Sequence, residues 1–470
     1  MKRPFTLVAC ALAALIALAA CATRPAPAAS ARAAASAPAA WRNTASTAST
    51  PRAAPVQQSW WQCFGDATLA RHITEALARN DDLRQAAARV AEARAMAAAQ
   101  HAAFWPSLDA GAVAQRSKAI SDVTLKPYQS SAHQELFQAA YEVDLWGRID
   151  ALARAADDNQ EASRAARDSV ALAVAASVAQ AYVGLLELDA QLDLASRQLD
   201  SRERTLMLAR QRRQQGYTGD LDLAQAEAER HAGAQALPQL RRALERQQAQ
   251  LNVLLGRAPG PVERGGALAA LHACALPDAG LPSALLRRRP DIVGAELQVA
   301  ASDAQLAASR TQWLPSLRLN ASLGQVESSV LRGDPFTIWS LGGSVLAPIF
   351  NGGRLRALAQ AAEARRDQAL AAYQRTVLGA WAEVEVQLNS HAQEQEQLGD
   401  ALAQRRALAE TLRIAQRRRQ EGYGSALDER LAERNVLGVE QAVIGQQSAL
   451  LQTQVALFRA LGGGWSPQSP

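Results

Sequence analysis

The sequence predicts a mostly α-helical chain with a membrane β-barrel, built from long α-helical hairpins and four β-strands per chain. Three observations support this fold class. The order of elements is written twice, two helical stretches are far longer than those of ordinary globular domains, and four short runs alternate between apolar and polar residues. Helices of that length are typical of stalks, and alternating runs with one oily face are typical of strands that meet lipid.

The N-terminus predicts export from the cytoplasm. Lys2 and Arg3 precede an apolar run over residues 7–20, which is too short to span a membrane comfortably and ends in small residues. Residues 1–20 are therefore predicted to be a signal peptide.

The apolar run ends at Leu18-Ala19-Ala20-Cys21, which resembles the bacterial lipobox. In a lipobox the cysteine thiol is lipidated and the chain is cut before it, so Cys21 is the expected lipidation site. Ordinary cleavage beside a chance cysteine is the alternative. Ala22 follows, rather than the aspartate that typically retains such lipoproteins at the inner membrane, so the resemblance implies sorting to the outer membrane. Residues 21–58 are predicted to be the lipid anchor and a disordered linker, since their Ala, Pro, Ser and Thr cannot build a core.

Charge and cysteine usage narrow the function classes. The formal net charge of +5 falls to +3 when Lys2 and Arg3 leave with the signal peptide, and a charge that small argues against a nucleic-acid partner. Cys63 and Cys274 remain in an oxidising compartment, where they either pair or stay buried.

After the linker, one design is written twice. The run that begins at Asp82 matches the run that begins at Asp291 at an offset of 209, and Arg212 to Tyr217 matches Arg418 to Tyr423 at an offset of 206. Leu145-Trp146-Gly147-Arg148 matches Ile349-Phe350-Asn351-Gly352-Gly353-Arg354 with two residues added. We therefore expect a first structural repeat at 59–282, a second at 283–464 and a C-terminal tail at 465–470.

Each repeat is predicted to hold a helix, two strands, a very long helix and a last helix. The expected helices cover about 70–103, 149–215 and 221–255, and then about 283–313, 355–421 and 427–461. Within the first long helix, a coiled-coil spacing is followed by Leu188, Leu192, Ala195, Leu199 and Leu206. Turns at the tips of the helical hairpins are predicted at Gly216, Gly219, Gly422 and Gly424.

The strand-like runs are expected at about 108–117, 134–145, 316–326 and 337–348. In the third run, Leu317, Leu319, Ala321 and Leu323 alternate with polar residues. No amphipathic segment is left over to cover such an oily face, so we expect it to meet lipid while the other face lines water. Aromatic residues suited to a membrane interface lie at or near the run ends, namely Trp105, Tyr141, Trp146, Trp313 and Trp339. Four strands cannot close a barrel, so several copies of the chain must share one.

Several blocks in this order resemble the TolC/OprM-type outer membrane factors, and in particular the lipoprotein branch (NodT-like) that works with resistance-nodulation-division pumps. The most specific blocks run from Leu285 to Ile292, from Leu314 to Leu317, from Tyr141 to Arg148 and from Pro348 to Arg354. The resemblance covers nearly the whole chain, from about Trp60 to Gly464.

The resemblance implies a homotrimer whose chains each give four strands to one 12-stranded barrel, with the long helices forming a periplasmic tunnel. It implies an outer membrane channel that conducts substrates passively, supplied by a periplasmic adaptor (membrane fusion) protein and an inner-membrane proton-driven pump. Aspartates near the second glycine turn narrow the periplasmic aperture in the family, and Asp428 lies at such a position, with Asp222 on the other hairpin. A further family aspartate is Leu431 here. Asp222 and Asp428 are also ordinary helix N-terminal residues, which is the alternative.

Two other function classes fit the sequence less well. An enzyme is disfavoured because the sequence contains no His-Glu-x-x-His, Cys-x-x-Cys, phosphate-binding loop or nucleophile elbow, so no cofactor or metal is expected. A periplasmic coiled-coil structural or adaptor lipoprotein would explain the helices and the lipid, but it would not explain strands that are written twice. The arginine runs 287–289 and 417–419 are expected to be solvated helix faces rather than anion sites.

Overall fold

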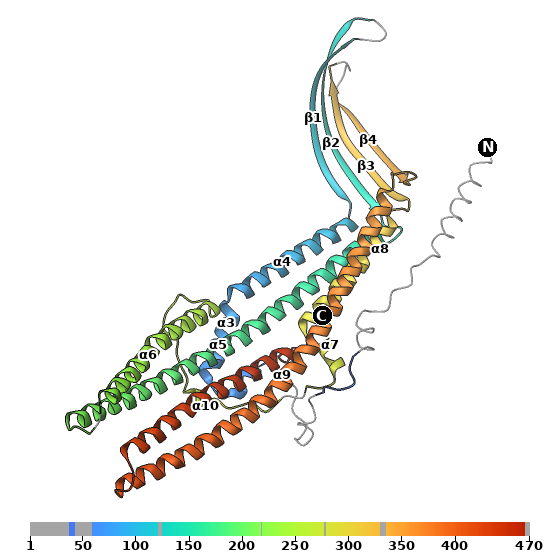
Figure 1. Cartoon of the computed structure of the whole chain (residues 1–470). Coiled ribbons are helices and arrows are strands. Elements are labelled where there is room, and N and C mark those ends of the chain that lie inside the picture. Colours follow the sequence, from blue (N-terminus) through green and yellow to red (C-terminus); the bar gives the residue numbers. More distant parts are fainter. Residues whose placement is uncertain are drawn as a thin grey trace.

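The computed structural model describes residues 37–42, 59–120, 125–217, 219–276, 279–329 and 335–465. The predicted signal peptide, Cys21 and most of the predicted linker lie outside these residues. The described chain is elongated, with helical hairpins at one end and a four-stranded sheet that projects alone at the other (Figure 1).

The two halves of the chain have the same order of α-helices and strands, and differ only in their short 3-10 turns. The first half contains η2 (Trp60–Phe64), α3 (Ala67–Arg79), α4 (Asp81–His101), η3 (Ala102–Phe104), β1 (Ser107–Ile120), β2 (Pro127–Val143), α5 (Arg148–Gln214) and α6 (Asp220–Leu254). The second contains η4 (Leu268–Ala270), η5 (Pro282–Ala284), α7 (Leu285–Arg288), α8 (Pro290–Thr311), β3 (Ser316–Ser328), β4 (Phe336–Leu346), α9 (Arg354–Gln420) and α10 (Ala426–Ala460).

The helix expected at about 70–103 is in fact two helices that meet at Asn80, so that prediction was wrong. Asn80 has an extended backbone, and its side chain accepts hydrogen bonds from the N–H groups of Asp82 and Leu83 at 3.0 and 3.2 Å, which caps α4. The second repeat breaks at the equivalent position, where Pro290 begins α8 after the extended residue Arg289.

These two breaks are tied to the ends of the last helices in the same way. The Asn80 amide donates to the carbonyl of Leu254 at 2.9 Å, and the Arg289 guanidinium donates to the carbonyl of Ala460 at 3.0 Å. Just beyond those carbonyls, Gly256 and Gly462 have positive φ and touch the backbone of the α3 or α7 end, where a Cβ atom would overlap. The two repeats therefore share equivalent hydrogen bonds and backbone contacts as well as the same helices and strands.

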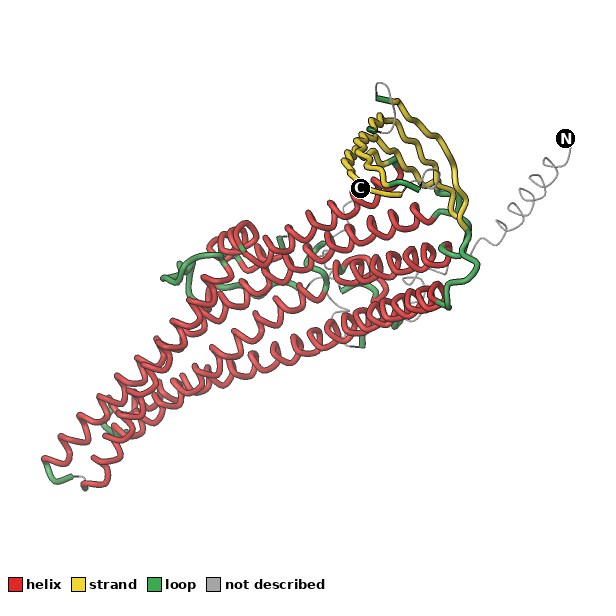
Figure 2. Tube along the Cα trace, turned by 90° about the horizontal axis from the view of Figure 1, so that it is seen from above, coloured by secondary structure: helices red, strands yellow, loops and turns green. Residues whose placement is uncertain are grey.

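The long helices α5 and α9 contain 67 residues each, which corresponds to roughly 100 Å. They run beside α6 and α10 as two long hairpins (Figure 2). Ala195 and Leu206 of the predicted seam in α5 are buried, but so is Leu194, because α5 packs on α6 and also on α8 and α10. An 18-residue window of α5 is apolar enough to cross a membrane, yet 56% of it is buried inside the structure, as in a core helix.

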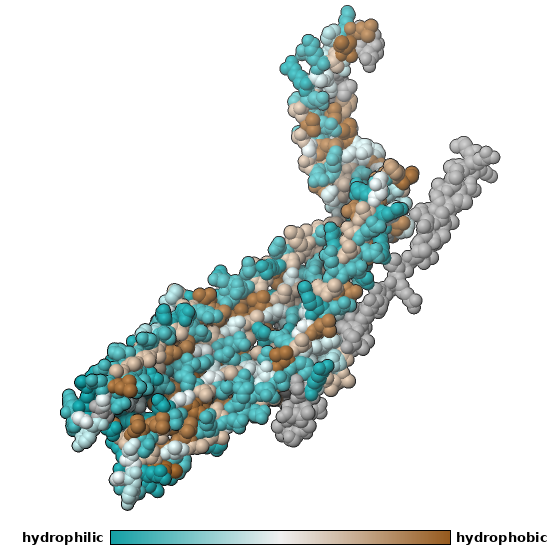
Figure 3. Space-filling model, viewed as in Figure 1, coloured by the Kyte–Doolittle hydropathy of each residue, from teal (hydrophilic) through white to brown (hydrophobic). Residues whose placement is uncertain are grey.

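The four strands form one antiparallel sheet in the order β1-β2-β3-β4. The register aligns the apolar sides of all four strands on one face. One cross-strand row, for example, consists of Ala110, Phe137, Leu323 and Trp339. The last three side chains of this row are more than half exposed. No helix in the described part of the chain covers either face of the sheet, and apolar side chains lie open along it (Figures 1 and 3). The outer edges of β1 and β4 have no partner within the described chain.

The main core lies where both repeats meet, beside the bases of the long hairpins. Trp60 stacks on Phe458 of α10 with ring centroids 5.2 Å apart, and Phe64 meets the same ring edge-on. Cys63 and Cys274, whose pairing the sequence left open, form a disulfide between the η2 turn and the segment that joins the repeats. This core ties the N-terminal turn of the folded body to the C-terminal helix.

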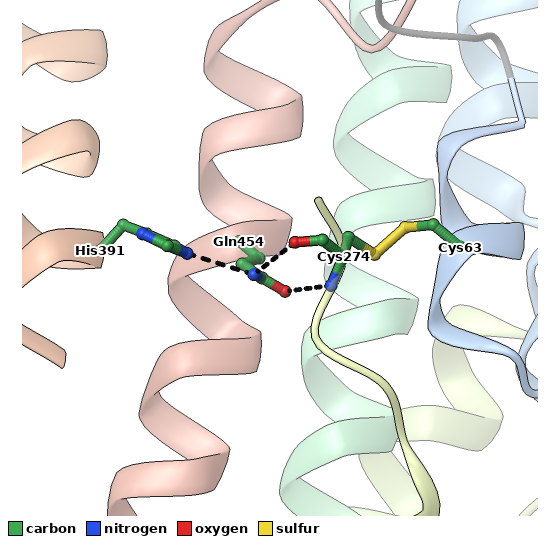
Figure 4. Close-up of a disulfide and its surroundings, with 4 residues drawn as sticks. All are labelled: Cys63, Cys274, His391 and Gln454. Atoms are coloured by element: carbon green, nitrogen blue, oxygen red, sulfur yellow. Dashed lines mark hydrogen bonds between the residues drawn. A yellow bond between two sulfur atoms is a disulfide. The ribbon is translucent and has the colours of Figure 1, made fainter. Parts of the chain in front are cut away.

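Gln454 of α10 connects the disulfide to α9 (Figure 4). Its amide oxygen accepts from the N–H of Cys274 and its amide nitrogen donates to the Cys274 carbonyl, both at 3.0 Å, so the amide can point only one way. The second N–H of this amide therefore faces the Nε2 atom of His391, which lies 3.2 Å away and must accept. His391 is only 5% exposed, and burial lowers its pKa below the ordinary value of 6.5.

The prediction that the arginine run 287–289 is a solvated helix face is wrong in part. Arg287 is exposed, but the Arg289 side chain is only 13% exposed and binds Asp291 and Glu383. Burial alone would raise the pKa of Glu383, but the hydrogen bonds from Arg289 and Arg459 outweigh it and hold that pKa below its usual value. Arg289 therefore joins the start of the second repeat to α9 as an ion-pair centre.

The His391 geometry predicts a pH dependence of stability. The pKa of His391 is lower in the folded than in the unfolded state, so its contribution is full above about pH 6.5 and is lost as the pH falls through the folded-state pKa. The free energy of unfolding should drop by up to about 1.4 kcal/mol for each pH unit in that window. Thermal unfolding of the protein in detergent, followed by circular dichroism between about pH 5 and 8, measures it.

The matched variants are His391→Gln and His231→Gln, because His231 is an exposed histidine on α6. The first should flatten the acid limb of the stability curve, and the second should leave it unchanged. An unchanged acid limb in His391→Gln would show that another group controls it.

Candidate channel lining and periplasmic tips

The sheet separates two kinds of surface on its two faces. Opposite the apolar face, a polar row crosses all four strands through Asp109, Gln138, Ser322 and Ser340. The hydroxyl groups of the two serines lie 2.7 Å apart. An apolar face that meets lipid and a polar face that meets water are what a strand in a membrane barrel requires.

A charged cluster lies on the polar face, near the helical end of the sheet. Glu142 of β2 accepts from the Arg148 guanidinium at 2.7 Å, and Arg318 of β3 lies 3.6 Å from its other carboxylate oxygen. Arg148 is the first residue of α5, so this cluster joins the strands to the long helix. The sequence did not predict this cluster, although Glu142 and Arg318 each alternate with apolar residues along their strands.

The four predicted tip glycines lie in the two hairpin turns. Gly216 and Gly422 follow α5 and α9 with φ of +79° and +81°, a backbone conformation that favours glycine. Gly219 is the N-cap residue of α6 and has no side chain to cap it. Gly424 sits against the last turn of α9, where a Cβ atom would crowd the backbone of Arg418 and Arg419.

Asp222 and Asp428 occupy the same position, the third residue of their helices, but their surroundings differ. Asp428 forms a capping box with Ser425: the Ser425 hydroxyl accepts from the Asp428 N–H at 3.1 Å, and the Asp428 carboxylate accepts from the Ser425 N–H at 3.3 Å. At the first tip the N-cap residue is Gly219, which offers no side chain, and Asp222 makes no side-chain hydrogen bond or ion pair within the described residues. The Ser-x-x-Asp spacing at 425–428 was the sequence signal for this cap.

Two arginines near the second tip, Arg419 and Arg430, already have partners. Arg419 pairs with Glu429, and Arg430 binds Glu433 at 2.7 Å. Burial tends to raise the pKa of Glu433, but Arg430 and Arg204 of α5 outweigh it and lower that pKa. These pairs leave the Asp428 carboxylate exposed, with Ser425 as its hydrogen-bond partner.

Both tips also expose apolar side chains at equivalent positions. Tyr217 and Tyr423 are 78% and 85% exposed, and Leu221 and Leu427 are 70% and 65% exposed. Exposed apolar residues gathered at the ends of rigid hairpins are typical of a docking surface. Among the described residues, no group of three or more histidine, cysteine or acidic side chains is arranged to hold a metal ion.

The comparisons with known proteins agree with this arrangement. The family model of the outer membrane efflux proteins matches residues 72–257 and 281–463. The chain belongs to the outer membrane efflux protein family. The predicted fold class, mostly helical with strands of a membrane barrel, is confirmed by solved channels of this kind.

The chain is 33% identical to the pyoverdine export outer membrane protein OpmQ of Pseudomonas putida, over 90% of this chain and 92% of the relative. It is 31% identical to the toluene efflux pump outer membrane protein TtgC of Pseudomonas putida, over 90% and 89%. The solved structure of the outer-membrane channel OprN has 30% identity and a TM-score of 0.80, covering 92% of this chain and 98% of that one. The protein is thus an outer membrane efflux component, located in the outer membrane.

Proposed function

We propose that this protein is the outer membrane channel of a tripartite efflux system and that three copies of the chain build it. The four-stranded sheet with two unpaired edges carries the proposal, since it has one apolar and one polar face. Three copies would supply the strands of a 12-stranded barrel, and α5, α6, α9 and α10 of each copy would form the periplasmic tunnel. The repeats 59–282 and 283–464 would then occupy equivalent places around it.

Transport through such a duct is passive. The family is one of channel proteins, and we infer no catalytic activity and no cofactor for this chain. The energy then comes from an inner-membrane proton-driven pump, reached through a periplasmic adaptor that contacts the exposed tyrosines and leucines of the tips. One relative is named for pyoverdine and another for toluene, which supports selection of the cargo by the pump rather than by the duct. We favour small amphiphiles as cargo.

The N-terminal segment adds a lipid anchor to this proposal. Cleavage after residue 20 would leave Cys21 as the lipidated first residue, with residues 21–58 linking it to the folded body. Cys21→Ser should abolish labelling by a palmitate analogue and slow the removal of the signal peptide. Channel assembly should persist, because the barrel inserts by its own apolar face. Equal labelling of the variant and the parent would refute the anchor.

The proposed aperture lies at the periplasmic tips. Three copies of Asp428 near one axis would repel each other and attract cations, since each carboxylate is exposed and has no arginine partner among the described residues of its own chain. Asp222 would contribute less if it lies farther from the axis.

The test is single-channel conductance in planar bilayers of the purified assembly. Asp428→Ala should raise conductance and weaken cation preference, and Asp222→Ala should change both less. Ser425→Ala is the matched control: it removes the cap, costs about 1 kcal/mol of stability, and keeps the carboxylate. If Asp428→Ala and Ser425→Ala behave alike, Asp428 is only a cap. If the parent forms no pores, the channel proposal itself fails.

A further inference from the structure

The two repeats have equivalent sequences but unequal surroundings. The long helices α5 and α9 have the same length, yet α5 contains twenty buried residues and α9 contains ten. The reason is that α5 packs on α4, α6, α8 and α10, whereas α9 packs mainly on α8 and α10. In the internal repeat, α4 is the equivalent of α8. The helix α5 packs on α8 of the other repeat, whereas α9 makes no comparable contact with α4. Only Ala86 and Ala97 of α4 are buried.

The strand registers define which residues of the repeats are equivalent. Ser107 pairs with Ala140 in the first repeat, and Ser316 pairs with Leu346 in the second. Ser107 and Ser316 differ by 209, and Ala140 and Leu346 differ by 206. The first residues of α5 and α9, Arg148 and Arg354, also differ by 206. One offset therefore holds from β2 into α5, and from β4 into α9.

This result corrects the alignment made from sequence. Matching Trp146 to Phe350 required two added residues after Phe350. The register requires none, and it places Gly352 at the position equivalent to Trp146. Trp146 instead has a contact within the chain, because its indole N–H donates to the carbonyl of Pro315 at 2.7 Å.

The strands β2 and β4 end at different places under this equivalence. β2 continues three residues past Ala140, and these residues pair only with β3, as Val143 does with Leu317. β4 stops at Leu346, the equivalent of Ala140. The next three residues, 347–349, have no strand partner among the residues that the structure describes, and Ile349 is 98% exposed. Their equivalents in β2 form strand only by pairing with β3. Residues 347–349 would therefore become strand only if another strand lay along the outer edge of β4, the edge away from β3.

We propose that β4 of one chain pairs antiparallel with β1 of a second copy, with Ile349 opposite Leu108 and Ser344 opposite Val113. This register is obtained from the β2–β3 register by replacing each residue of β2 with its equivalent in β4 and each residue of β3 with its equivalent in β1. The pairing would extend β4 from Leu346 to Ile349. The inference rests on the shared barrel proposed above and adds to it the residue contacts at each junction between chains.

The facing side chains agree with this register. Leu108, Val345 and Ala112 belong to the apolar face, and Ile349 joins the same face once β4 is extended to it. The lipid-facing surface then continues across the junction. Ser344 lies on the polar face beside Arg318, and its partner Val113 lies on that same face beside Gln134. A shift of one residue would place the oily side of one strand against the polar side of the other.

Pro348 provides an independent check. In the β2–β3 pair, the N–H of Ser329 donates to the carbonyl of Ser131, which makes this a hydrogen-bonded pair. Because such pairs alternate, Glu142 is a non-hydrogen-bonded position towards β3. Pro348 is the equivalent of Glu142, so its missing N–H would point away from the second copy. A proline is tolerated there, although it would break the pairing at either neighbour.

The test is disulfide cross-linking of cysteine pairs in the full-length protein in membranes. Val113→Cys with Ser344→Cys forms a non-hydrogen-bonded pair, where Cβ atoms approach most closely, and it faces the aqueous side. Oxidation should yield covalent dimers and trimers on non-reducing gels, about ten-fold more than either offset pair. The offset pairs combine Ser344→Cys with Gly111→Cys or with Gln115→Cys, on the same face of β1. The parent, whose Cys63 and Cys274 are bonded to each other, is the control.

Each outcome is decisive. Preferential cross-linking of the Gly111 pair would support the sequence alignment with two added residues and overturn this register, while leaving the shared barrel intact. A trimer by native mass in which no pair cross-links would overturn β4–β1 pairing altogether. A protein that remains a membrane-inserted monomer would overturn the proposed function as well.

Discussion

In a lipid bilayer, backbone N–H and C=O groups have no water to bind, and each unsatisfied group costs several kcal/mol. The outer edges of β1 and β4 present rows of such groups along strands of 14 and 11 residues. No other described part of the chain reaches these edges. The sheet is therefore incomplete in one chain, and the sharing of strands between copies follows from this constraint rather than from any single side-chain contact.

The rest of the chain fixes the position of the sheet relative to the helices. The Arg148–Glu142–Arg318 cluster fixes the start of α5 to the strands, and the core around Trp60 and Phe458 joins both repeats. The disulfide, Gln454 and His391 connect that core to α9. Rigid hairpins of this length carry the tips far from the sheet, so one polypeptide can line both a membrane pore and a periplasmic passage.

The sequence predicted the fold class, the repeat and the turn glycines because periodicity and glycine chemistry are local signals. It missed the break at Asn80, since a cap inside an alanine-rich run leaves the helical periodicity intact. It started β2 too late, because around Gln129 both faces become polar while the backbone pairing continues. It also treated Arg289 as solvated, because its ion partner Glu383 is distant in sequence. The Ser425 cap was not predicted, although the Ser-x-x-Asp spacing at 425–428 signals it, whereas the exposed state of Asp428 required the structure.

The most direct test of the shared barrel is the native mass of the purified protein in detergent. The full sequence has a mass of 50.1 kDa, and the proposed mature chain differs from it by the loss of residues 1–20 and the addition of the lipid on Cys21. The account predicts a single dominant species with three times the mass of this mature chain, which dissociates only on unfolding. A folded, membrane-inserted species with the mass of one chain would contradict it, because a four-stranded sheet would then be stable in lipid with both edges open.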